Sequence, residues 1–229
     1  MKAIVFDSGP IITFALNSLL PMMKFLQEEY KGIFYIPNDV EKEIIAQPSK
    51  SKKFGFESYM VRGLLKDNIV EVFDTKIYRQ ETEIITTLAN GIYSINGRDL
   101  YILNAGELDA LVLAKNINAD AVVVDERTTR VILENPYRLV KYLEKKFHGK
   151  VEINKDKLKE FEKHFSTLKI IRSVELALVA FDKGYFDTMA AYENKIDFVS
   201  SLLWALKLHG SAVSEREIAA LIKYYKQGK

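Results

Sequence analysis

Cysteine is absent from the 229-residue chain, and only three histidines are present. Without cysteine the chain can form no disulfide, zinc ribbon or iron–sulfur cluster, and it has no thiol nucleophile. Any bound metal ion must therefore be held by oxygen or by histidine. His148, His164 and His209 lie in lysine-rich or polar surroundings without a partner four residues away, so we interpret each as a surface residue.

Long apolar runs are also missing. No run reaches the ~18 residues that a membrane span requires. The apolar start of the chain has one preceding lysine and no small-residue cleavage site. We therefore expect a cytoplasmic protein without membrane contact. A charge excess is missing too, since 33 Lys and Arg face 31 Asp and Glu, and a net charge of +2 does not by itself indicate nucleic-acid binding.

Short β-branched runs alternate with helical patterns over most of the chain. Strands are predicted at "AIVF", "GIFYIP", "IVEVF", "AVVV" and "LKII". Helices are predicted between them: over about 11–30 with a break near Pro21, in "NDVEKEIIA", over about 105–115, and from about Arg127. Strands separated by helices favour an α/β fold with a parallel sheet and helical crossovers.

Two segments fall outside this alternation. The polar, basic stretch "QPSKSKKFG" predicts a loop, and residues 56–93 after it are expected to form an additional pair of helices around "IVEVF". The last stretch predicts two helices, because Gly210 ends one and Ser214 with Glu217 forms a capping box that opens the next. Their apolar surface is expected to pack on the core or to form a dimer seam.

Acidic residues stand where the predicted strands end. Asp7 follows the first strand and Asp125 follows "AVVV", so two parallel strands would bring both carboxylates to one sheet edge, where ligands of α/β proteins bind. Glu107, in the first turn of the helix before the Asp125 strand, should point toward the same edge. Glu43 lies at the border of the apolar face of its helix. Asp109, about 200° around the helix from Glu107, is expected to be solvated.

Each acid also has a purely structural interpretation. Asp7 or Asp125 could be a helix N-cap, Asn104 with Glu107 resembles a capping box, and Glu43 could be a solvated charge. These interpretations would have to place separate caps on one edge by coincidence. Carboxylates gathered at one place repel one another unless cations hold them together, and ligand sets made only of oxygen select Mg²⁺ or Mn²⁺.

The pieces "IVFDSGPII", "IPNDVEKEII", "GELDALVLA" and "VVVDERTTR" occur in an order that resembles the PIN-domain ribonucleases. The resemblance spreads over roughly residues 1–135 and extends to "TLKIIRSVELALVAFDKGYF", with Ser173 at the end of the last strand. It implies a three-layer α/β/α fold with a central parallel sheet. The matching positions imply that the metal-binding acids are Asp7, Glu43, Glu107 and Asp125.

This resemblance implies a PIN-like domain over residues 1–187 with a helical insertion at about 47–97, followed by a C-terminal helical extension over residues 188–229. The implied activity is that of an endoribonuclease, in which two Mg²⁺ or Mn²⁺ ions support hydrolysis of phosphodiester bonds in single-stranded RNA. Asp7, Glu107 and Asp125 would be the catalytic residues.

Basic residues are candidates for substrate binding. Arg127 and Arg130, with the N–H groups that open their helix, could meet RNA phosphates; a solvated helix face is the other interpretation. Lys50, Lys52 and Lys53 precede a group of aromatic residues: Phe54, Phe56 and Tyr59. Such a segment could bind single-stranded RNA through phosphate contacts and stacking, unless the aromatic rings belong to the core.

Other classes of protein fit less well. A haloacid-dehalogenase-type phosphatase needs a second Asp two residues after the first, and that residue is Gly9. Neither glycine pattern of P-loop or dinucleotide-binding folds occurs. The remaining alternative is a non-catalytic PIN-like module that binds RNA or a protein. A homodimer and an antitoxin-like partner both stay open.

Overall fold

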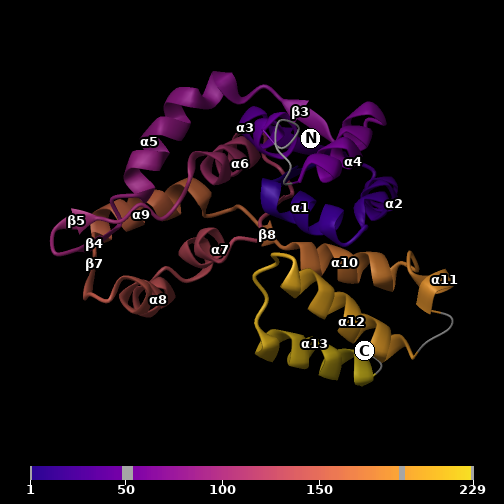
Figure 1. The fold of residues 1–229 in the computed structure, drawn as a ribbon. Helices are drawn as coiled ribbons and strands as arrows, with labels where there is room; N and C mark the ends of the chain where they lie inside the picture. The colour runs from indigo at the N-terminus through magenta and orange to yellow at the C-terminus, as the bar shows by residue number, and fades with distance from the viewer. Residues whose placement is uncertain (1, 48–53, 191–193, 228–229) are drawn as a thin grey trace.

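The computed structural model describes residues 2–47, 54–190 and 194–227. Its centre is a five-stranded parallel sheet in the order β3-β2-β1-β6-β8 (Figure 1). The strands of this sheet are β1 (Ala3–Phe6), β2 (Ile33–Pro37), β3 (Glu71–Phe73), β6 (Ala121–Val123) and β8 (Ile170–Ile171). The predicted α/β fold with a parallel sheet is thereby confirmed.

Helices cover both faces of the sheet. One face carries α1 (Ser8–Leu16), α2 (Leu20–Tyr30), α3 (Asn38–Glu41) continued by the π-helix η1 (Lys42–Ala46), α4 (Gly55–Lys66), α10 (Ser173–Asp182), α11 (Asp187–Ala190), α12 (Lys195–Leu208) and α13 (Glu215–Lys226). The other carries the short 3₁₀ helix η3 (Thr75–Tyr78), α5 (Arg79–Ala89), α6 (Ala105–Asn116), α7 (Arg127–Glu134), α8 (Tyr137–Phe147) and α9 (Lys155–Phe165).

The sequence of β1 explains why two cores form. Successive side chains of a strand point to opposite faces. Ile4 and Phe6 accordingly pack in the core on the α1 side, whereas Ala3 and Val5 pack in the core on the α6 side. All four residues are buried, as expected for a central strand of a sheet that is covered on both faces. The fold is the predicted three-layer α/β/α arrangement.

The segment predicted as a helical insertion also contributes to the central sheet. Its strand β3 pairs in parallel with β2 and forms the edge of the sheet. Val70 and Val72 bring apolar surface to this edge, which explains why "IVEVF" joins the sheet. A second, antiparallel sheet of β4 (Tyr93–Ile95), β5 (Arg98–Asp99) and β7 (Val151–Ile153) lies at one end of the molecule.

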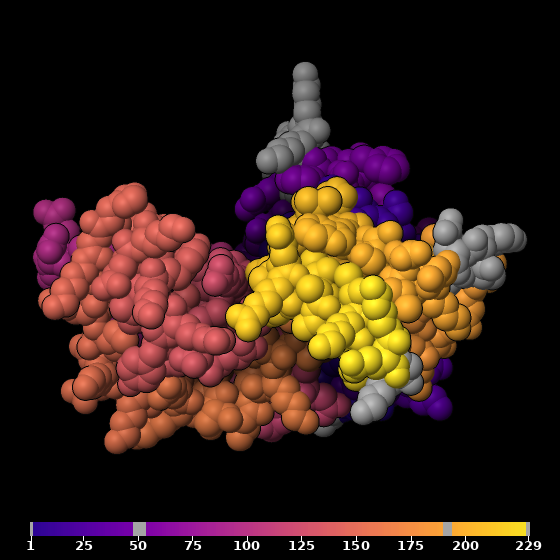
Figure 2. Space-filling view, turned by 90° about the horizontal axis from the view of Figure 1, so that it is seen from below, coloured from indigo at the N-terminus to yellow at the C-terminus, as the bar shows by residue number. Residues whose placement is uncertain are grey.

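The C-terminal helices α12 and α13 form a hairpin that packs on the α1 side of the molecule. Val199, Leu203 and Leu206 are buried in the same core as Phe14 of α1. The predicted packing of this extension on the core is therefore confirmed. Figure 2 shows the hairpin in yellow, next to the surface formed by residues of α7 and α8. None of the helices in the described residues is long and apolar enough to cross a membrane.

Candidate functional site

Asp7 and Asp125 meet at the carboxyl end of the central sheet. Phe6 of β1 lies opposite Val123 of β6, and the Asp7 N–H donates to the Val123 carbonyl at 3.0 Å. Asp7 and Asp125 therefore follow the ends of two adjacent strands and lie at almost the same height along the sheet. Both are buried, with 4 % and 2 % of their surface exposed. The structure thus brings together the two acids that the sequence placed at one edge.

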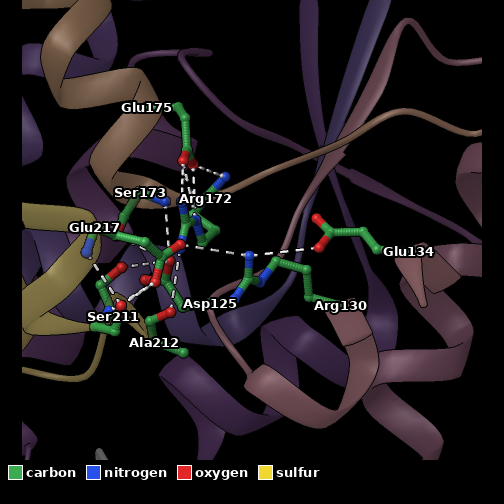
Figure 3. A network of polar contacts seen from close by, with 10 residues as sticks. Asp125, Arg130, Glu134, Arg172, Ser173, Glu175, Ser211, Ala212 and Glu217 are labelled. Atoms are coloured by element: carbon green, nitrogen blue, oxygen red, sulfur yellow. Dashed lines mark hydrogen bonds and ion pairs between the residues drawn. The ribbon is translucent and has the colours of Figure 1, made fainter. Parts of the chain in front are cut away.

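The Asp125 carboxylate accepts four hydrogen bonds. Its Oδ1 accepts from the Ser173 N–H and the Ser173 hydroxyl, both at 2.9 Å, and from the Ser211 hydroxyl at 3.1 Å. Its Oδ2 accepts from the Thr13 hydroxyl at 3.0 Å. Figure 3 shows the serine side chains converging on it. These donors fix the position of a buried carboxylate.

Asp125 is not the N-cap of the helix that follows it, so that structural interpretation of Asp125 was wrong. The cap of α7 is Glu126, whose carboxylate accepts hydrogen bonds from the N–H groups of Thr128 and Thr129. These helical N–H groups, expected to meet RNA phosphates, are therefore already satisfied. Glu126 also adds a negative charge near Glu107, and no motif of the sequence predicted this place for it.

Glu107 is buried and caps its own helix. Its Oε2 accepts from the Asn104 N–H at 3.2 Å, and its own N–H donates to Asn104 Oδ1 at 2.9 Å. Burial, and after it the carboxylates of Asp7 and Glu126, raise the pKa of Glu107 to about 8, although the hydrogen bond from Asn104 opposes the rise. The capping box is thus confirmed. Glu107 is at the same time one of four neighbouring acids, Asp7, Glu43, Glu107 and Asp125, which are called the acidic cluster from here on.

Asp7 is likewise buried next to other acids. It caps α1, although the contact from the Gly9 N–H is long at 3.5 Å. Burial is the main cause that raises the pKa of Asp7 to about 7. The charges of Glu43 and Asp125 act in the same direction, and the N–H groups of Ser8 and Gly9 oppose the rise. Asp7 is therefore a carboxyl group that holds its proton close to neutral pH.

Glu43 approaches the cluster from η1. A β-carbon on Gly106, which lies next to Glu107, would stand 3.6 Å from Glu43 Oε2. The Glu43 side chain is exposed, whereas its neighbours Ile44 and Ile45 are buried. Glu43 thus lies at the border of the apolar face, as expected, and near both Asp7 and the first turn of α6. π-Helical turns such as η1 are frequent at functional sites.

The chemistry of this cluster fits a hard divalent cation. Its members supply only carboxylate oxygens, which Mg²⁺ and Mn²⁺ prefer. A cation would offset both the burial and the mutual repulsion that raise the pKa of Asp7 and Glu107. Within the described residues, however, no three acidic or histidine side chains are close enough to hold an ion together. The carboxylates must therefore turn toward one another to bind one.

Asp109, expected to be solvated, is buried instead. It accepts hydrogen bonds from the hydroxyls of Thr75 at 2.7 Å and Thr82 at 3.4 Å. Burial raises its pKa, and the hydrogen bond from Thr75 opposes the rise. The expectation failed because η3 and α5 pack against this side of α6, a long-range contact that helical periodicity does not show.

Beside Asp109 lies a cavity of about 600 Å³. Polar residues of η3 and α5 line it together with three cations and three acids: Lys42, Lys76, Arg79, Asp39, Glu83 and Asp109. Lys42 pairs with Asp39, and Arg79 pairs with Glu83. Lys42 precedes Glu43, and the cavity also reaches Ala105, which precedes Gly106. The cavity therefore opens next to the acidic cluster.

The predicted substrate-binding residues have diverse surroundings. Arg127 is exposed, with its guanidinium 5.2 Å from the centre of the Tyr142 ring. The Arg130 side chain, only 16 % exposed, has Nη1 at 3.5 Å from Glu134 and 3.9 Å from Glu217. Arg130 therefore binds the C-terminal hairpin here, and a phosphate contact by either arginine stays a prediction.

The predicted basic and aromatic segment is described only in part. Lys50, Lys52 and Lys53 lie outside the described residues. Phe56 and Tyr59 lie one turn apart on α4 and are 74 % and 67 % exposed. The interpretation that these two rings belong to the core was therefore wrong.

Comparison with known proteins gives one result. A family model described as "PIN domain" matches residues 3–136. This range includes all four acids of the cluster and ends before Ser173 and Ser211. No curated protein matches the chain. No solved structure matches it either.

Proposed function

The chain belongs to the PIN-domain family, whose fold is of the nuclease type, and we propose that it is a metal-dependent endoribonuclease acting on single-stranded RNA. One observation carries the proposal: four carboxylates of the family's motif positions come from separate elements and influence one another at one sheet edge. Burial is the main cause of the raised pKa values of Asp7 and Glu107, and the charges of neighbouring acids add to both. Perturbed carboxylates at such an edge are typical of functional sites.

The four acids would hold Mg²⁺ or Mn²⁺. Asp7 and Asp125 are the principal ligands in this proposal, and Glu107 and Glu43 complete or orient the ligand set. Divalent ions held by these residues would supply an activated water and would stabilise the leaving oxygen of an in-line displacement at phosphorus. The chain's own contribution is geometric: β1 and β6 fix two carboxylates, and the capping box with Asn104 fixes the backbone that carries Glu107.

Single-stranded RNA is proposed as substrate because of two surfaces near η1, the element that carries Glu43. One is the cavity of about 600 Å³, which has the size of a small-ligand site and whose wall combines cations with acids. Helix α4, which packs on η1, exposes Phe56 and Tyr59, and the Arg62 guanidinium lies 5.6 Å from the Tyr59 ring centre. Exposed rings next to cations can stack the bases of a flexible strand, worth about 1–3 kcal/mol per base.

The test is cleavage of a labelled single-stranded RNA with Mn²⁺ and with EDTA. Asp7→Asn and Asp125→Asn should each abolish cleavage in a protein that still folds. Asp109→Asn is the control for the metal site, because Asp109 is a buried acid of the same helix as Glu107 whose carboxylate binds the hydroxyls of Thr75 and Thr82. Since Asp109 also lines the cavity, the quantity that should stay at the wild-type value in this variant is Mn²⁺ affinity.

The alternative is a non-catalytic PIN-like module that binds RNA or a protein. Cleavage that survives in both the Asp7 and Asp125 variants, with contaminating nuclease excluded, would support this alternative. So would tight RNA binding that shows no cleavage with any divalent ion. A Phe56→Ala and Tyr59→Ala double variant separates binding from chemistry, since it should raise KM for RNA and leave Mn²⁺ binding unchanged.

A further inference from the structure

A loop from the C-terminal hairpin reaches the candidate site. This loop, residues 209–214 between α12 and α13, places the Ser211 hydroxyl 3.1 Å from Asp125 Oδ1 and the Ala212 N–H 3.2 Å from the Asp125 carbonyl. Ser211 is 3 % exposed. The contact is therefore a buried one, made by a segment beyond the range that matches the family model.

The hydrogen bonds are distributed unequally between the two carboxylate oxygens of Asp125. A carboxylate oxygen has two lone pairs. Oδ1 already accepts three donors, two from Ser173 and one from Ser211, whereas Oδ2 accepts only the Thr13 hydroxyl among the contacts of the described residues. Oδ2 is thus the oxygen with a remaining acceptor position, and Asp125 can offer it to a cation without breaking this arrangement.

Arg172 holds the loop in place. Its Nη1 donates to the Ala212 carbonyl at 3.2 Å and to Glu217 Oε1 at 3.0 Å, and its guanidinium also pairs with Glu175 (Figure 3). Arg172 directly precedes Ser173 at the end of β8. Arg172 therefore binds the hairpin loop, and Ser173, the next residue, binds Asp125.

We propose that Ser211 is a positioning residue of the metal site, through which the C-terminal hairpin orients Asp125. The Ser211 hydroxyl keeps Oδ1 engaged, so that Oδ2 would be the oxygen that Asp125 offers to a bound ion. This inference rests on the proposed function only in taking Asp125 as a metal ligand. Partners that orient a metal ligand typically change metal affinity about 10- to 100-fold when removed.

The experiment measures Mn²⁺ affinity by titration calorimetry on the full chain. Ser211→Ala should weaken Mn²⁺ binding roughly tenfold or more. The variant should still fold, because Oδ1 keeps both donors of Ser173. Ser211→Thr retains the hydroxyl and should restore the affinity to near the wild-type value.

Ser214→Ala is the matched control. It removes a hydroxyl from the same loop, but Ser214 caps α13 through Glu217 and makes no contact with Asp125 among the hydrogen bonds of the described residues. This control should lower the melting temperature of the metal-free protein and leave the Mn²⁺ affinity unchanged. A purely structural role of the loop would instead make both alanine variants behave alike.

The outcomes separate this inference from the proposed function. If wild type binds Mn²⁺, Asp125→Asn does not, and Ser211→Ala binds as tightly as wild type, only the role of Ser211 is overturned. If Asp125→Asn binds Mn²⁺ like wild type, or if wild type binds none, the proposed metal site and the role of Ser211 both fail. Weaker binding in Ser211→Ala with unchanged binding in Ser214→Ala supports the inference, even if Ser211→Thr does not fold.

Discussion

Asp7 and Asp125 approach the same point above the first turn of α1. A β-carbon built on Gly9 would lie 3.6 Å from Asp7 Oδ2 and 3.5 Å from the Asp125 Cβ. These are ordinary contact distances, so a methyl group fits there without a clash. The glycine therefore keeps open a small space between two carboxylates that come from neighbouring strands.

Gly9→Ala should consequently separate stability from metal binding. Alanine within a helix is more favourable than glycine by about 0.5–1 kcal/mol, so the metal-free protein should be as stable as wild type or slightly more stable. The methyl group should restrict how the two carboxylates turn toward an ion and lower the Mn²⁺ affinity roughly tenfold. Thermal melts with and without Mn²⁺ measure both effects.

Gly63→Ala provides the control for this change. Gly63 is also helical, and a β-carbon there would meet nothing within 4 Å. It should gain the same helical stability with an unchanged response to Mn²⁺. An equal Mn²⁺ response in both variants would show that the space above Gly9 is unrelated to metal binding.

The stability of the metal-free protein should fall as pH rises from about 4 to 8. The pKa of Asp7 rises from 3.8 to about 7 on folding and that of Glu107 from 4.5 to about 8, so in this interval the folded state binds more protons than the unfolded state. Unfolding then releases protons and becomes easier at higher pH. Each unit of pKa difference between the folded and the unfolded state corresponds to about 1.4 kcal/mol in the free energy of unfolding. Urea titrations at several pH values measure the slope, which should flatten in Asp7→Asn.

Mn²⁺ affinity should rise over the same interval and level off above about pH 8. The ion must displace the protons of Asp7 and Glu107, and fewer remain to be displaced as pH increases. Calorimetry in buffers of different ionisation enthalpy should therefore detect proton release at pH 7. Binding that is independent of pH between 6 and 8 would mean that neither carboxyl is a ligand.

The sequence predicted the acidic edge because strand ends are local features. Asp7 and Asp125 each follow a short buried strand, and parallel pairing then fixes their relative position. The capping box at Glu107 and the one at Ser214 were predictable for the same reason, since each lies within four residues.

What the sequence did not predict depends on contacts between distant segments. Asp109 is buried by η3 and α5, and Ser211 reaches Asp125 across 86 residues. Strand β4 pairs with β7 more than fifty residues away. Helical or strand periodicity shows which face of an element is apolar and leaves open which partner covers it. Glu126 was missed for a local reason, because the adjacent Asp125 is a residue type that N-cap positions favour more strongly than glutamate.

Two glutamates in the same motif should respond oppositely to the same substitution. Glu107 and Glu217 are both the third residue of a capping-box helix. Burial among acids raises the pKa of Glu107 to about 8. At Glu217 burial is outweighed by hydrogen bonds from Ser214 and Arg172, which lower its pKa to about 2. Glutamine can accept the capping hydrogen bond in either helix, so the charge is the property that changes.

At pH 8 without metal, Glu107→Gln should therefore stabilise the protein, by about 1 kcal/mol or more, because a repelled charge is removed. Glu217→Gln should destabilise it by up to about 1 kcal/mol, since its ion pair with Arg172 is partly exposed and screened by solvent. The Glu217 contribution should itself disappear as pH falls from about 4.5 toward 2, where the folded carboxylate becomes protonated. Urea titrations of the two variants beside wild type provide the comparison.

The response to Mn²⁺ distinguishes a metal ligand from a helix cap at Glu107. Its stabilising effect should shrink in Glu107→Gln, since ligand-induced stabilisation depends on the affinity of the folded state, and RNA cleavage should fall by orders of magnitude. In Glu217→Gln both should remain near wild type, because Arg172 keeps its contacts with Glu175 and the Ala212 carbonyl. If Mn²⁺ raises the melting temperature of both variants equally and cleavage persists in Glu107→Gln, Glu107 serves only as a helix cap, and the proposed site is reduced to the acids at the ends of β1, β6 and η1.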